Sequence, residues 1–129
     1  MPHVTMEYSA NLDERLDIDG LCARIHETLL ATGVFELAAI RVRALRADSY
    51  AVADRLPENS FLDISLRMGQ GRTTVQRREI GEAVYATALA AVRPLLSSQH
   101  FALSFEIREI DSDMSWKTNG FRARLLEHT

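Results

Sequence analysis

The sequence predicts an α+β fold in which two β-α-β units form a four-stranded mixed sheet with two helices on one face. Three observations predict it. Four segments alternate apolar and polar residues, which is the pattern of half-buried strands. Two longer segments repeat apolar residues every three or four positions, as amphipathic helices do. The order strand, helix, strand occurs twice, so each pair of flanking strands is expected to run parallel and the helices to share one layer.

The first unit covers about residues 1–57. It opens with a strand over about residues 2–8, in which Val4, Met6 and Tyr8 face one side. The helix that follows ends near Gly33, since glycine commonly stops a helix. Its apolar stripe consists of Leu21, Cys22, Ile25 and Leu29. A strand over about residues 37–45 completes the unit.

The second unit covers about residues 58–110 and repeats this order. Its first strand contains the alternating residues Leu62 to Met68, and a glycine-rich turn follows it. Thr73 and Gln76 have the spacing of a capping box, which predicts that a helix begins there. The last strand is expected over residues 101–110. The remaining segment, residues 111–129, is polar with aromatic anchors and is expected to form an interface segment.

Length and charge limit the classes of function. The 129 residues suit a single domain spanning 1–129, and 47% apolar residues supply a core. A net charge of -3 argues against nucleic acid or an anionic membrane as partner, because both favour a basic face. The N-terminus lacks the pattern of a secretory signal, so a cytoplasmic location is expected. The single cysteine, Cys22, is interpreted as a structural thiol.

The second residue, Pro2, is the candidate catalytic group. If Met1 is removed, Pro2 becomes a free secondary amine at the start of a strand. Ordinary α-amino groups have a pKa of about 7.7–8.0, so modest desolvation or a nearby cation leaves such an amine neutral and able to accept a proton at physiological pH. The alternative interpretation is that the proline only begins an edge strand, where its missing N–H costs nothing.

Five segments of the chain carry a resemblance to a known family. They are residues 1–11, 31–35, 40–43, 69–72 and 102–106, with the sequences MPHVTMEYSAN, ATGVF, IRVR, GQGR and ALSFE. In this order they resemble the 5-carboxymethyl-2-hydroxymuconate isomerases of the tautomerase superfamily. The resemblance implies the tautomerase fold, a homotrimer, and an N-terminal proline that moves a proton along a dienol carboxylate in homoprotocatechuate catabolism without any cofactor.

The resemblance also implies roles for basic side chains. Arg41 and Arg72 match the family's substrate-binding arginines, and the planar guanidinium suits bidentate binding of carboxylates. Arg43 shares the strand face of Arg41 and is a further candidate, although interface ion pairs would explain it equally well. Lys117, the only lysine of the chain, lies in the segment that could reach a neighbouring subunit and the substrate.

Metal and nucleotide sites are not expected. The four histidines show no spacing typical of a zinc site, and the GQG turn lacks the third glycine and the acidic residue of a dinucleotide site. Two alternative functions stay open at this point. One is a non-catalytic ferredoxin-like module that binds a small ligand, since the same order of elements occurs there. The other is a different tautomerase-superfamily activity.

Overall fold

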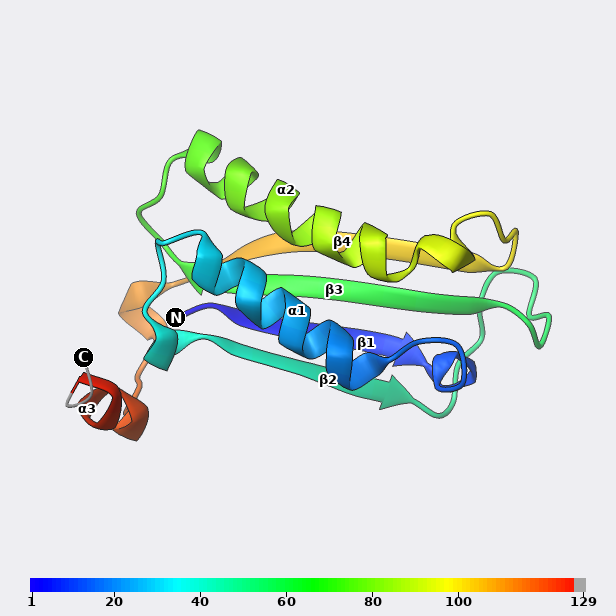
Figure 1. The fold of residues 1–129 in the computed structure, drawn as a ribbon, viewed down its shortest axis with the longest axis horizontal. Coiled ribbons are helices and arrows are strands. Elements are labelled where there is room, and N and C mark those ends of the chain that lie inside the picture. Colours follow the sequence, from blue (N-terminus) through cyan, green and yellow to red (C-terminus); the bar gives the residue numbers. More distant parts are fainter. Residues whose placement is uncertain (127–129) are drawn as a thin grey trace.

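The computed structural model describes residues 1–126 and contains four strands and three α-helices (Figure 1). In chain order these are β1 (His3–Ser9), α1 (Ile18–Ala31), β2 (Arg41–Ala47), β3 (Ser60–Gly69), α2 (Thr74–Ala91), β4 (Phe101–Ile110) and α3 (Gly120–Leu126). Short 3-10 turns lie at Ala10–Leu12, Leu37–Ala39, Arg93–Leu95 and Ser112–Met114.

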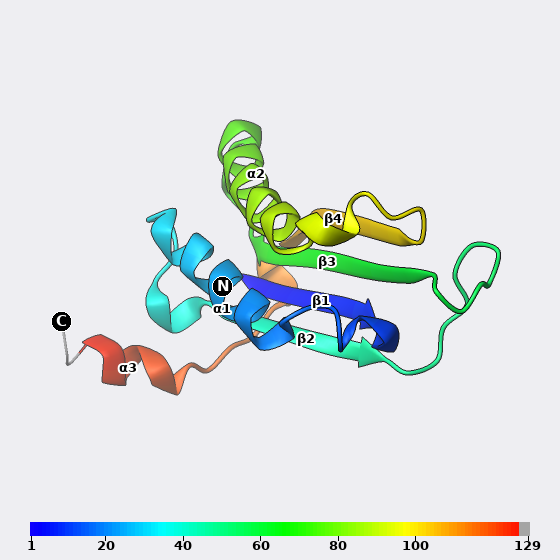
Figure 2. The same cartoon turned by 45° about the vertical axis from the view of Figure 1, so that its right-hand side comes forward.

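The strands form one sheet in the order β2-β1-β3-β4. Within each β-α-β unit the two strands are parallel, and β1 pairs with β3 antiparallel, which makes the sheet mixed. Helices α1 and α2 lie side by side over the same face, as two views show (Figures 1 and 2). The predicted fold class is therefore confirmed.

The core lies between these helices and the sheet. The inward residues of the central strands are fully buried, among them Val4 and Met6 of β1 and Leu66 of β3. Helix α1 contributes Ile25, and α2 contributes Val84, both with no exposed surface. The alternating apolar residues of the strands thus pack against the apolar faces of the helices in one layer. Most of the hydrophobic stabilisation arises there.

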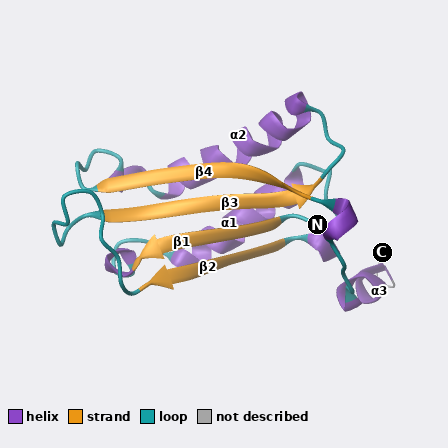
Figure 3. Ribbon diagram, turned by 180° about the vertical axis from the view of Figure 1, so that it is seen from behind, coloured by secondary structure: helices purple, strands orange, loops and turns teal. Residues whose placement is uncertain are grey.

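The opposite face of the sheet is polar and open (Figure 3). Across its four strands, Arg41, His3, Arg67 and Arg108 are partners in register and form one row. Towards the other end of the face, a carboxylate of β1 lies opposite one of β3, at Glu7 and Asp63. The face is therefore basic at the end where β1 begins and acidic further along.

The predicted strand over residues 37–45 is wrong at its start. Residues Leu37–Ala39 form a 3-10 turn, in which Ala39 N donates to Glu36 O at 3.0 Å. The strand begins only at Arg41. Alternation cannot distinguish the two conformations here, because Ala38 and Ile40 are buried in the turn as they would be in a strand.

The segment after β4 folds back on its own chain. The Asn119 side chain donates to Ala38 O at 2.9 Å, and Arg122 pairs with Glu36 at 3.1 Å. Trp116, however, is 85% exposed, so this aromatic anchor is not covered by the chain itself. The last three residues of the expected interface segment, 127–129, lie outside the described residues.

Within residues 1–126, no helix combines the length and the apolar character that crossing a bilayer requires.

The cap of α2 generates a stability prediction. The Thr73 hydroxyl accepts from Gln76 N at 3.1 Å, and Gln76 Oε1 accepts from Thr73 N at 2.9 Å, which confirms the predicted capping box. Thr73→Ala removes the hydroxyl and should lower the free energy of unfolding by about 1 kcal/mol. Urea unfolding followed by circular dichroism at one protein concentration measures it. Thr73→Ser keeps the hydroxyl and serves as the control; equal loss in both variants would contradict the cap's role.

Candidate active site

One end of the sheet gathers most of the candidate residues. Because β1 and β2 begin there while β3 and β4 end there, the N-terminus meets both the 69–72 turn and the segment after β4. Pro2 is buried at this end, and its carbonyl accepts from Arg41 N at 3.1 Å, which continues the β1–β2 ladder by one residue. The backbone pairing thus fixes the position of the proposed base.

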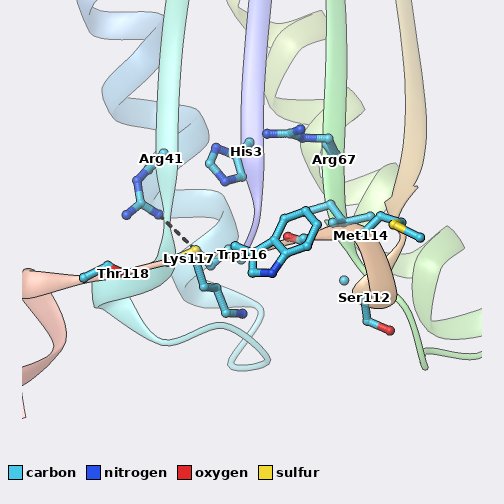
Figure 4. A pocket seen from close by; sticks show the side chains of 12 residues that line it. His3, Arg41, Arg67, Ser112, Met114, Trp116, Lys117 and Thr118 are labelled. Atoms are coloured by element: carbon cyan, nitrogen blue, oxygen red, sulfur yellow. Dashed lines mark hydrogen bonds between the residues drawn. The ribbon is translucent and has the colours of Figure 1, made fainter.

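Two hollows open at this end of the sheet. The first, called the proline hollow here, is lined by Pro2, Phe35, Glu36, Arg72 and Arg122, among others. The second, called the tryptophan hollow, is lined by residues that include His3, Arg41, Arg67 and Trp116 (Figure 4). Met1 and Lys117 line both hollows.

Arg72 is held in the proline hollow by an aromatic ring and by two carbonyls. Its guanidinium carbon lies 4.7 Å from the centre of the Phe35 ring, within the range of a cation–π contact. It donates to Gly69 O and Val34 O at 3.4 Å each. Both hydrogen bonds are longer than the usual 2.7–3.2 Å range. The guanidinium is therefore positioned, yet its donors are not strongly engaged.

Arg41 lines the tryptophan hollow, and its guanidinium, like that of Arg72, is held by weak hydrogen bonds and an aromatic ring. Its guanidinium donates to Ala39 O at 3.3 Å and to the Met1 sulfur at 3.4 Å (Figure 4). Phe121 of α3 lies 5.9 Å away as a cation–π partner. The thioether is a weak acceptor, so Arg41 also keeps donors for an incoming anion.

The charges at this end act on the N-terminal amine. Desolvation lowers the pKa of the Met1 amino group, and the nearby Lys117, Arg72 and Arg41 lower it further, with Glu36 opposing them. Both effects disfavour a positive charge. The neutral, proton-accepting form of an amine is therefore favoured in this place.

The positive field also extends along the sheet. Desolvation, followed by the charges of Arg67, Arg43 and Arg41, lowers the pKa of His3 to about 4. His3 is therefore neutral at pH 7.

The structure brings most of the predicted site residues together. Pro2, Arg72 and Lys117 share the proline hollow, and Arg41 and Lys117 share the tryptophan hollow. Arg43 lines neither of them and instead lies 3.4 Å from His3 Nδ1 on the open face.

Sequence reasoning missed several residues of the two hollows as site candidates, among them Arg67, Trp116 and Arg122. The signal for Arg67 is its register opposite His3, which becomes visible only once β1 and β3 are paired. Within residues 1–126, no group of three His, Cys, Asp or Glu side chains is placed to hold a metal ion.

Comparison with known proteins gives the family. The model of the family described as 5-carboxymethyl-2-hydroxymuconate isomerase matches residues 2–125. The chain is 36% identical over 123 residues to the 5-carboxymethyl-2-hydroxymuconate Delta-isomerase of Escherichia coli, with 95% of this chain and 98% of the relative covered.

Solved structures agree with this result. The crystal structure of a 5-carboxymethyl-2-hydroxymuconate isomerase from Deinococcus radiodurans R1 superposes with a TM-score of 0.89 at 34% identity, covering 96% of this chain and 93% of that one. A structure described as a fused 4-OT wild-type symmetric trimer has a TM-score of 0.57 at 15% identity, covers 90% and 93% of the two chains, and shows the tautomerase fold alone. The chain belongs to the 5-carboxymethyl-2-hydroxymuconate isomerase family.

Proposed function

We propose that this isomerase converts 5-carboxymethyl-2-hydroxymuconate to its 2-oxo-3-ene isomer in homoprotocatechuate catabolism, with Pro2 as general base. The observation that carries the proposal is the identity of 36% with a relative of that name over nearly the whole of both chains. The position of Pro2 on the wall of a hollow that also contains Arg72 and Lys117 supports it. A non-catalytic binding module would require neither feature.

The proposed chemistry is a proton transfer with no net change in oxidation state. The neutral Pro2 nitrogen takes the proton from the 2-hydroxyl group, and the oxygen electrons form the C2=O bond. The C2=C3 electrons move to C3=C4, and the electrons of the former C4=C5 bond take the proton that Pro2 returns at C5. A single base that alternates between neutral and protonated forms is sufficient for both transfers.

The arginines have two proposed effects. Arg72 and Arg41 bind substrate carboxylates and stabilise the negative charge that develops on the oxygen at C2. Their charges also keep the pKa of the amine low, as they do for the Met1 amino group. Removal of Met1 moves the amine by one residue within the same hollow, so the same desolvation and the same cations act on Pro2.

A homotrimer is part of the proposal. The outer edges of β2 and β4 have no strand partner among the described residues, and exposed sheet edges normally require cover. Trp116 and Met114 are 85% and 71% exposed, which is unusual for such side chains unless a neighbour covers them.

The first prediction concerns the N-terminus. An uncleaved N-terminal extension turns the Pro2 nitrogen into an amide, which has no basic lone pair, so ultraviolet monitoring of the dienol should show activity reduced to background. A protease that leaves Pro2 as the first residue should restore it, with intact mass verifying each end. Full activity in the extended protein would contradict the proline mechanism.

The second prediction concerns Arg72. Arg72→Ala should lower kcat/KM about 10- to 100-fold, the range expected when a charge-assisted hydrogen bond is lost. Loss of this cation stabilises protonated Pro2 and raises its pKa, so the acidic limb of the kcat/KM profile should move to higher pH. Arg78→Ala removes an exposed arginine of the neighbouring helix α2, outside both hollows, and is the matched control. An unchanged pH profile would remove Arg72 from the field around Pro2.

The third prediction concerns assembly. Multi-angle light scattering of the untagged protein at micromolar concentration should give three times the chain mass of 14.5 kDa. Trp116→Ala should weaken the assembly and shift this mass downward on dilution, because it removes a large exposed apolar side chain. A monomeric wild-type protein would contradict the shared interface.

A further inference from the structure

Arg67 lies in the centre of a row of basic residues. The β1–β3 register places it opposite His3, and the β1–β2 register places His3 opposite Arg41. At the usual strand spacing the backbones of Arg41 and Arg67 lie about 10 Å apart, on either side of His3. Figure 4 shows the Arg67 side chain extending towards His3 above the indole of Trp116. Both arginines line the tryptophan hollow.

No acidic side chain of the described part of the chain neutralises the portion of this row that lines the tryptophan hollow. Among the described residues, the tryptophan hollow has Arg41, Arg67 and Lys117 on its wall and neither Asp nor Glu. No ion pair of residues 1–126 involves Arg67, whereas Arg108, the next residue of the row, lies 2.9 Å from Glu106. Three cations that converge on one hollow without a counterion make a site for an anion of more than one charge.

The tryptophan hollow meets the proline hollow at the N-terminus. Met1 and Lys117 are the residues that line both. Removal of Met1, as the proposed function requires, takes away one of the two residues that line both hollows and leaves the Pro2 nitrogen as the new N-terminus on the wall of the proline hollow. A ligand bound at Pro2 could then extend in both directions.

We propose that the tryptophan hollow binds the C5 end of the substrate and that Arg67 determines specificity for the carboxylates there. This inference rests on the proposed function, in which the dienol carries one carboxylate at C1 and two at its C5 end. The three cations of the tryptophan hollow suit the doubly charged end. The proline hollow has Arg72 for the C1 end, and its one carboxylate among the described residues, Glu36, is already paired with Arg122.

The test compares two dienols in the untagged enzyme and in Arg67→Gln. One is the tricarboxylate, and the other is 2-hydroxypenta-2,4-dienoate, which has the same dienol and C1 carboxylate but neither carboxylate of the C5 end. Arg67→Gln should lower kcat/KM for the tricarboxylate about 10- to 100-fold, mainly through KM, because one charge-assisted contact is lost. The rate with the short dienol should stay unchanged.

Two further variants control the comparison. Arg108→Gln makes the same substitution in the same row, outside the hollow, and should leave both rates unchanged. Arg67→Lys keeps the charge and should show a smaller loss than Arg67→Gln with the tricarboxylate. If Arg67→Gln retains the wild-type rate with the tricarboxylate, or loses both substrates equally, the assignment is overturned.

Calorimetry separates this inference from the proposed function. If wild-type enzyme turns over neither dienol, the proposed function fails. Calorimetric titration with propane-1,2,3-tricarboxylate then tests whether the tryptophan hollow is an anion site. Binding to the wild type that is at least about tenfold weaker in Arg67→Gln supports an anion site at Arg67. Equal binding to the two proteins, or no binding to the wild type, contradicts it.

Discussion

The antiparallel pairing of β1 with β3 is the constraint on which the rest of the structure depends. It joins two parallel β-α-β units into one sheet and brings the starts of β1 and β2 to the same end as the finishes of β3 and β4. The N-terminus, the 69–72 turn and the segment after β4 meet only for this reason. The same register sets Arg67 opposite His3 and Glu7 opposite Asp63, so a single pairing determines both the location of the site and the charge pattern of the open face.

The sequence predicts the fold well because its periodicities are clear. Buried residues alternate along β3 without interruption, and the capping box of α2 forms as its spacing predicts. The one misplaced boundary, at residues 37–40, has a physical reason. Ala38 and Ile40 are buried whether the backbone is extended or forms a 3-10 turn, so the pattern of burial contains no information about which conformation forms.

The site is less predictable, since it depends on distances between strands and not on spacing within them. Pro2 and Arg72 could be named from their place in the chain and from family resemblance. Arg67 could not be recognised, because alternation identifies it only as a residue of the polar face and its role depends on its neighbours in β1. Arg43, in contrast, is a candidate from the sequence and lies outside both hollows. It shares the strand face of Arg41 but lies two residues further along the strand.

The accumulation of positive charge at one end of the sheet has a cost that argues for function. Arg41, Arg67 and Lys117 repel one another, and the described part of the hollow supplies no acid to offset them. After desolvation, Lys117, Arg72 and Arg41 lower the pKa of the N-terminal amine, and Arg67, Arg43 and Arg41 lower the pKa of His3. Other arginines of the chain do have an acidic partner, as Arg46 does with Asp13 at 2.8 Å and Arg122 with Glu36 at 3.1 Å. The proposed function gives the cations beside the desolvated amine a role, which is to bind an anionic substrate. In the proposed function, a multiply charged carboxylate completes the charge balance on binding, and a low pKa of the N-terminal amine keeps the proposed base ready to accept a proton.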